Sequence, residues 1–119
     1  MVRFTPLAGA RSDGGPCCFL LELESGRLLL DCGWDVEFDA TALSSLANVA
    51  QHVDAVLLSH GDLAHVGGLP HAVAHLGLTA PIFATLPVAK MGHLAVYGAH
   101  MSCSFSRAHF DEAIFSLAD

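Results

Sequence analysis

The sequence predicts an α/β fold in which a mixed β-sheet is flanked by helices. Three candidate strands come first, at residues 2–7, 17–23 and 27–32, and the second and third of them are apolar runs. Two further apolar runs, at residues 53–59 and 81–84, alternate with segments of helical periodicity. Strands that come first and are followed by alternating helices and strands indicate a layered structure of sheet and helix.

The first half of the chain is expected to form three strands. Residues 2–7 read as a strand, and residues 11–16 (Arg-Ser-Asp-Gly-Gly-Pro) form a turn by composition. The runs 17–23 and 27–32 flank the turn residues Glu-Ser-Gly at 24–26. This arrangement predicts a β-hairpin.

The middle of the chain is expected to alternate helix and strand. Asp39 is suited to cap a helix that buries residues at helical spacing, namely Leu43, Leu46, Ala47 and Ala50. The run 53–59 then reads as a buried strand. Pro70 in a first turn and Gly77 just past the end predict the next helix.

A last strand and helix follow. Residues 81–84 read as a core strand, and Thr85 is suited to cap a helix that begins near Pro87. The expected buried face of this helix is apolar: Val88, Met91, Leu94 and Ala95. Gly92 and Gly98 count against that helix, because glycine weakens helix interiors.

The composition predicts one partial domain. The 119 residues are 53% hydrophobic and only 14% charged, whereas average domains carry roughly 25% charged residues. That excludes a disordered chain, yet it is very apolar for a free-standing domain of this length. The chain also stops at Asp119, a residue suited to begin a helix. We therefore expect residues 1–119 to be a single partial domain that is truncated at its C-terminal end.

Charge and hydropathy exclude two classes of function. The net charge is −7, and no Lys or Arg lies between residues 28 and 89, so this segment is a poor candidate for gripping a phosphate backbone. Residues 63–89 lack charged side chains but contain three prolines and a Gly-Gly pair, so no membrane span is expected. The N-terminus does not resemble a signal peptide. The four cysteines have no C-x-x-C spacing and are expected to be reduced core thiols: Cys17, Cys18, Cys32 and Cys103.

The most informative segment follows the buried strand 53–59. His60, Asp62 and His65 lie in a short glycine-bounded turn that can bring several side chains to one point. Imidazole and carboxylate groups are ligands that zinc accepts. A candidate metal site is therefore expected at the end of this strand.

Asp-Cys-Gly at 31–33, Val-Leu-Leu-Ser-His at 56–60 and His-x-Gly-Gly at 65–68 resemble the metallo-β-lactamase fold family. That family binds two metals through H-x-H-x-D-H, and its metals turn a bridging water into hydroxide. His60 matches the first histidine and His65 the last, but Asp62 replaces the second histidine and Ala64 replaces the aspartate. The resemblance therefore implies degenerate metal-site positions, which are Asp31, His60, Asp62, Ala64 and His65.

A narrower resemblance rests on longer stretches. The segments 31–35, 53–60, 65–70, 69–78 and 82–92 are similar to the catalytically silent metallo-β-lactamase/β-CASP family that supplies subunit 2 of the cleavage and polyadenylation specificity factor. In that family H-x-D-x-x-H is itself the pattern. The implied fold is the N-terminal part of a metallo-β-lactamase-like sandwich, in which a mixed β-sheet has flanking helices.

This narrower resemblance implies a non-catalytic nuclear subunit of the machinery that cleaves and polyadenylates pre-mRNA. Its implied partners are the related active endonuclease subunit, a scaffold protein and, through the complex, pre-mRNA, with no membrane. It implies no catalytic residue, no bound metal and no cofactor. Two other readings stay open at this point: a diverged metallohydrolase that uses His60, Asp62 and His65, and a stand-alone interaction domain.

Several side chains also have simpler interpretations. His60 and His65 can be turn histidines bound to backbone carbonyls, and Asp62 can be a turn or capping carboxylate. Asp31 can accept backbone N–H groups in its own turn. Gly67-Gly68 either let the start of a helix approach an anion or form a tight turn. Three further residues carry two readings each. Trp34 either packs in the core or at its rim, or it is a partner anchor. His71 and His75 form either a solvated face or a metal-binding pair.

Overall fold

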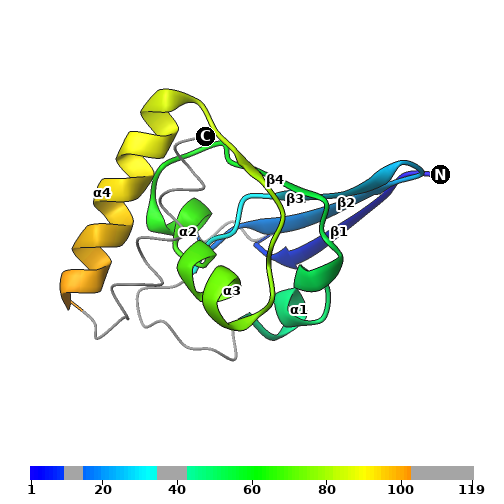
Figure 1. The fold of residues 1–119 in the computed structure, drawn as a ribbon, viewed down its shortest axis with the longest axis horizontal. Helices are drawn as coiled ribbons and strands as arrows, with labels where there is room; N and C mark the ends of the chain where they lie inside the picture. The colour runs from blue at the N-terminus through cyan, green and yellow to red at the C-terminus, as the bar shows by residue number, and fades with distance from the viewer. Residues whose placement is uncertain (10–14, 35–42, 103–119) are drawn as a thin grey trace.

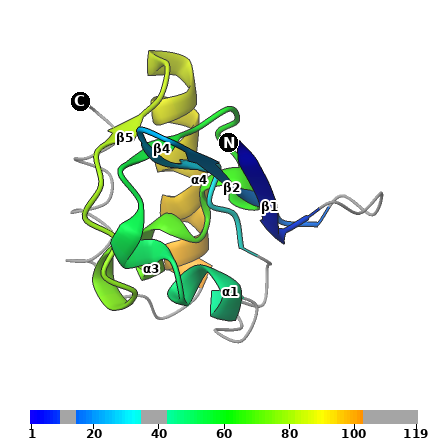
Figure 2. The same ribbon diagram turned by 90° about the vertical axis from the view of Figure 1, so that its right-hand side faces the viewer.

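The computed structural model describes residues 1–9, 15–34 and 43–102. Within these ranges the strands form one five-stranded sheet in the order β1-β2-β3-β4-β5 (Figures 1 and 2). The strands β1 (Arg3–Ala8), β2 (Cys18–Leu23) and β3 (Gly26–Leu30) are antiparallel neighbours. The short strands β4 (Ala55–Leu57) and β5 (Ile82–Phe83) continue the sheet in parallel. The predicted mixed sheet is therefore confirmed.

The predicted hairpin has a tight turn. Leu23 pairs with Gly26, so only Glu24 and Ser25 connect β2 to β3. The carboxylate of Asp54 binds the chain next to this turn, because it accepts the Arg27 backbone N–H at 2.8 Å.

The helices of the structure differ in number and in length from those that the sequence patterns predict. The predicted helix around residues 43–50 is broken into α1 (Ser44–Ala47) and the 3₁₀ turn η2 (Ala50–His52), and its proposed cap Asp39 lies outside the described residues. Two helices follow β4, which are α2 (Leu63–Val66) and α3 (Leu69–His75). Figures 1 and 2 show α1 and α3 on one side of the sheet.

The two faces of the sheet differ in exposure. The cross-strand row Leu20, Leu29, Val56 and Ile82 is at most 3% exposed and forms the core beneath the helices. The opposite face is equally apolar but largely open. Its outward row runs through Phe19, Leu30, Leu57 and Phe83. Phe83 is 53% exposed and Leu57 is 39% exposed.

The long helix α4 (Leu86–Ser102) buries a different face from the one that its hydrophobicity predicts. Met91 and Leu94 are 59% and 66% exposed, although both were expected in the core. The buried positions are small or short residues, namely Ala89, Gly92, Val96 and Ala99. A Cβ on Gly61 would lie 2.8 Å from the backbone nitrogen of Gly92. The helix approaches the chain so closely that bulky side chains must point away.

The remaining expectations are met in part. Cys18 and Cys32 are buried free thiols and Cys17 is a partly buried free thiol, while Cys103 lies outside the described residues, as does the tail 115–119. Trp34 is 3% exposed and belongs to the core, so the alternative of an exposed partner anchor is wrong.

Thr85 caps α4 only loosely, because its hydroxyl lies 3.5 Å from the Val88 N–H donor. In the part of the chain that the structure describes, no helix has the length and apolar character to cross a membrane.

Candidate functional site

The candidate site is the loop that leaves β4 and turns into α2. It was predicted as a turn, but residues 63–66 form one turn of α-helix. Asp62 has extended backbone at the helix start, and its carbonyl accepts the Val66 N–H at 2.9 Å. Its side chain does not cap the helix. Asp62 was expected to be a turn or capping carboxylate, and the capping alternative is therefore wrong.

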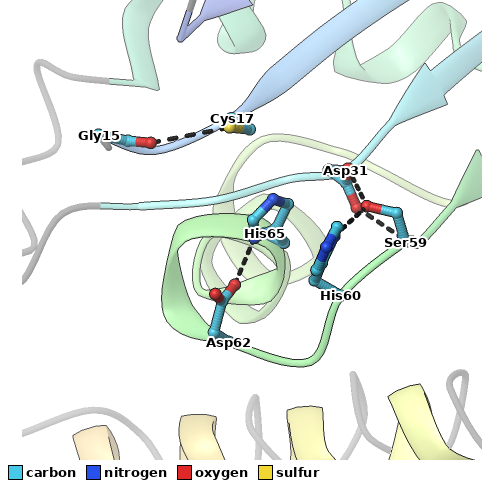
Figure 3. Close-up of polar contacts among 7 residues, drawn as sticks. All are labelled: Gly15, Cys17, Asp31, Ser59, His60, Asp62 and His65. Carbon is cyan, nitrogen blue, oxygen red and sulfur yellow. Dashed lines mark hydrogen bonds and ion pairs between the residues drawn. The ribbon is translucent and has the colours of Figure 1, made fainter. Parts of the chain in front are cut away.

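The carboxylate of Asp62 instead contacts the imidazole of His65, as Figure 3 shows. A carboxylate only accepts hydrogen bonds, so Nδ1 of His65 carries the hydrogen and donates it. The side chain of Asp62 is 63% exposed and that of His65 is 19% exposed. The pair therefore sits at the surface, and in the neutral form of His65 the lone pair is on Nε2.

A second chain of hydrogen bonds holds His60 (Figure 3). The Ser59 hydroxyl lies 2.7 Å from Oδ2 of Asp31 and 2.7 Å from Nδ1 of His60. Because the carboxylate must accept, the hydroxyl gives its hydrogen to Asp31 and accepts the Nδ1 hydrogen of His60. The histidines were expected to bind backbone carbonyls, but side chains hold both rings.

The two histidine rings lie face to face. Their centroids are 4.2 Å apart and the ring planes differ by 30°. Both Nδ1 atoms are occupied by Ser59 and Asp62, so the free lone pair of each neutral ring is on Nε2. The loop therefore brings together three of the predicted site residues, which are His60, Asp62 and His65, and it links Asp31 to them through Ser59.

Asp31 ties the ends of two neighbouring strands together. It is 8% exposed and has a φ of 62°, a left-handed conformation that a non-glycine residue adopts at a cost. Its Oδ1 accepts the Ser59 backbone N–H at 2.8 Å, and its own N–H donates to Leu57 at 2.9 Å. The carboxylate thus accepts an N–H from the neighbouring strand end, not from its own turn as the simpler interpretation expected.

The backbone of α2 is clamped by two distant segments of the chain. The carbonyl of Ala64 accepts the Cys17 N–H at 2.7 Å, and that of His65 accepts the Cys32 N–H at 2.8 Å. The carbonyl of Leu63 accepts the Trp34 N–H at 3.0 Å. Sequence reasoning missed these bonds because they involve only backbone atoms.

Glycines make this clamp possible. A Cβ on Gly33 would lie 1.8 Å from the Ala64 carbonyl oxygen, and one on Gly68 would lie 2.9 Å from the Gly33 oxygen. Gly68 also donates its N–H to the Cys32 carbonyl at 2.9 Å. Position 68 is therefore a glycine because two backbone segments approach closely there, and not because it binds an anion. In the sequence, the glycines at 33 and 68 were the signal for this close approach.

The donor atoms of the loop do not fit the two-metal centre that the H-x-H-x-D-H signature of the metallo-β-lactamase fold family holds. Ala64 has no ligand atom, and Asp62 is already bound to His65. The thiol of Cys17 is a poor substitute, because burial, then the charges of Asp31 and Asp62, raise its pKa and keep it protonated. Among the described residues, no three His, Cys, Asp or Glu groups are placed to hold one ion.

A second histidine pair lies on α3. The ring of His71 is 4.8 Å from that of Trp34 and 4.9 Å from that of His75, measured between centroids. Burial, then the neighbouring charge of His75, lower the pKa of His71. The expected solvated face is therefore only half right, since His75 is exposed but His71 is partly buried against Trp34.

A family model of the metallo-beta-lactamase superfamily domain matches residues 20–119. The chain therefore belongs to the metallo-β-lactamase superfamily.

Within this class the chain is similar to subunit 2 of the cleavage and polyadenylation specificity factor. It is 48% identical to that subunit from Oryza sativa over 99% of its own length, and 44% identical to the probable subunit from Drosophila melanogaster over 100% of its length. It spans 15% of the length of each of these relatives. Integrator complex subunit 11 from Danio rerio is 31% identical over 72% of the chain, which spans 15% of that relative.

Solved structures support the fold alone. The short form of human tRNase Z matches with a TM-score of 0.53 and 18% identity, covering 84% of this chain and 41% of that structure. A diphosphatase of the PhnP family matches with a TM-score of 0.55 and 17% identity, covering 82% of this chain and 47% of that structure.

Proposed function

We propose that this chain is a non-catalytic part of the cleavage and polyadenylation specificity factor and acts in the nucleus in 3′-end processing of pre-mRNA. The observation that carries the proposal is the similarity to two subunit 2 relatives, 44% and 48% identical over essentially the whole chain. The chemistry of the loop supports the same conclusion, because Asp62 and Ala64 stand where the superfamily signature has metal ligands.

In this proposal, positions 31, 60, 62, 64 and 65 are a former metal site that now serves the fold. Asp31 fastens the end of β4, and His60 and Asp62 complete hydrogen bonds to Ser59 and His65. The three α2 carbonyls accept backbone N–H groups from residues 17, 32 and 34. This segment therefore keeps a structural role in a subunit that has lost its catalytic activity.

The proposed partners are the active endonuclease subunit and the scaffold protein of the processing complex. Pre-mRNA is then reached through the complex. The absence of Lys and Arg from residues 28–89 supports this indirect route, since binding to a phosphate backbone requires cationic side chains.

We further propose that residues 1–119 form part of a two-sheet domain, and that the open sheet face receives its second sheet. The apolar row Phe19, Leu30, Leu57 and Phe83 is the surface that such a layer would cover. Exposed apolar patches of this kind mark contact surfaces.

Affinity capture tests the assignment. The tagged chain is expressed in cells, and proteins recovered from nuclear extract are identified by mass spectrometry. We expect the 3′-end processing subunits to co-purify with the native chain and with Gly98→Ala, a helix position with open space around it. Gly33→Ala, which collides with the Ala64 carbonyl, should recover less. Recovery of none of these subunits by the native chain would refute the assignment.

The captured complex also tests the non-catalytic role. A His60→Gln, His65→Gln double variant changes only exposed side-chain hydrogen bonds and leaves the backbone clamp of α2 in place. It should therefore recover the same subunits and cleave a pre-mRNA substrate at the native rate. A complex of unchanged composition whose cleavage rate falls more than tenfold would instead support the diverged metallohydrolase.

A further inference from the structure

The histidine pair on α3 lies outside the degenerate loop and has no role in the proposed function. His71 and His75 are four residues apart in a helix that ends at His75, so both side chains lie on one helix face. Two histidines at this spacing on a helix are a recurring way to hold a transition metal.

The distance between the rings fits a shared ion. The centroids of His71 and His75 are 4.9 Å apart, with the planes tilted by 51°. Two imidazoles that each place a nitrogen about 2.0–2.1 Å from one tetrahedral ion have ring centres roughly 5 Å apart. The separation of the two rings therefore matches the one that a shared ion requires.

Neighbouring groups hold both histidines of the pair in place. The indole of Trp34, 3% exposed, packs 4.8 Å from the His71 ring and restricts its orientation. After His75, Leu76 donates its N–H to Ala72 at 3.1 Å and Gly77 leaves the helix with a φ of 77°. The helical geometry thus holds up to the last histidine.

The electrostatic setting also favours a bound cation. Burial, then the neighbouring charge of His75, lower the pKa of His71, which keeps its imidazole in the neutral form that binds metals. Carbonyl groups at the end of a helix carry partial negative charge. The net charge of −7 adds a general attraction for cations.

We propose that His71 and His75 form a binding site for a late divalent transition metal ion such as Cu²⁺, Ni²⁺ or Zn²⁺. One imidazole nitrogen from each residue ligates the ion, and water completes the coordination. Hard cations such as Mg²⁺ and Ca²⁺ do not compete, because they prefer oxygen ligands.

Trp34 provides a direct readout, since it is the only tryptophan in the chain and touches His71. Cu²⁺ is titrated into the dilute 119-residue chain while tryptophan fluorescence is recorded. Paramagnetic Cu²⁺ bound at His71 should quench the emission in a saturable way. A large excess of Zn²⁺ should restore it by competition, because Zn²⁺ binds nitrogen ligands more weakly than Cu²⁺, and the same excess of Mg²⁺ should not.

Matched variants locate the ion. His75→Gln replaces an exposed side chain and leaves the contact between Trp34 and His71 intact; it should weaken Cu²⁺ binding at least tenfold. The His60→Gln, His65→Gln double variant should bind Cu²⁺ as the native chain does. Electron paramagnetic resonance should show two nitrogen ligands in the native chain and fewer in His75→Gln. Quenching that survives His75→Gln but disappears in the double variant, or quenching that never saturates, would overturn the proposal.

Discussion

The carbonyl oxygen of Ala64 lies against Gly33 so closely that a Cβ on Gly33 would stand 1.8 Å from it. This contact joins the Asp-Cys-Gly turn after β3 to the helix that carries the degenerate site. The adjacent bonds Cys17 N–H to Ala64 and Cys32 N–H to His65 cross the same junction. The degenerate loop is therefore a packing element of the domain.

Gly33→Ala should destabilise the chain by about 3 kcal/mol, because neither backbone segment can move away without breaking the clamp. Gly98→Ala is the control, since a Cβ there meets nothing within 4 Å. That change should stabilise the chain by about 0.5–1 kcal/mol, since alanine is the better helix former. Urea unfolding measures both, and equal stability of the two variants would disprove the clamp.

His60 should carry its hydrogen on Nδ1. The Ser59 hydroxyl donates to Asp31 and so must accept from His60. In Asp31→Asn the new amide would donate to the hydroxyl, which would then donate to Nδ1 and move the imidazole hydrogen to Nε2. Nitrogen-15 NMR of the histidine rings distinguishes these tautomers. The same His60 tautomer in the native chain and in Asp31→Asn would contradict the assignment.

Cys17 should react slowly with alkylating reagents near neutral pH. Its pKa is raised by burial and by the charges of Asp31 and Asp62, so little reactive thiolate is present. Asp62→Asn removes one of these charges and should shift the pH profile of alkylation at Cys17 to lower pH. Asp54→Asn, just before β4 and in contact with Arg27 beside the β2–β3 turn, is the control and should leave the profile unchanged. Peptide mass spectrometry after timed labelling gives the rate; a profile that is the same in all three proteins would rule out the electrostatic cause.

The isolated chain should bind hydrophobic dyes and self-associate through its open sheet face. Leu57→Thr with Phe83→Thr should reduce both effects while keeping the fold, because both side chains point outward. Val56→Thr, at the neighbouring position with 0% exposure, should instead cost about 1–3 kcal/mol by burying a hydroxyl. Size-exclusion chromatography and dye fluorescence provide the measurement. A monodisperse native chain without dye binding would refute the partial-domain proposal.

The strands could be predicted because their signals are local. The apolar runs around Glu24 and Ser25 defined the hairpin, and Pro70 with Gly77 marked the ends of α3. The buried face of α4 was mispredicted because hydrophobicity pointed to Met91 and Leu94. The contact with Gly61 selects small residues instead, and that depends on a segment about thirty positions earlier in the chain.

Part of the site could also be predicted. The motif located His60, Asp62 and His65 at one strand end, as the structure has them. The central position of Ser59 between Asp31 and His60 was not predicted, because a serine there carries no distinctive sequence signal. The backbone clamp depends on tertiary approach between distant segments, to which only the glycines at 33 and 68 pointed.

The metal content of the chain tests the central claim most directly. The native chain and the His60→Gln, His65→Gln double variant are purified without chelator, dialysed extensively and analysed by inductively coupled plasma mass spectrometry. We predict less than one zinc ion per native chain, and the same content in the double variant, because Ala64 has no donor atom and Asp62 is bound to His65. Two zinc ions per native chain that are lost in the double variant would contradict the proposal that the site has lost its catalytic metals.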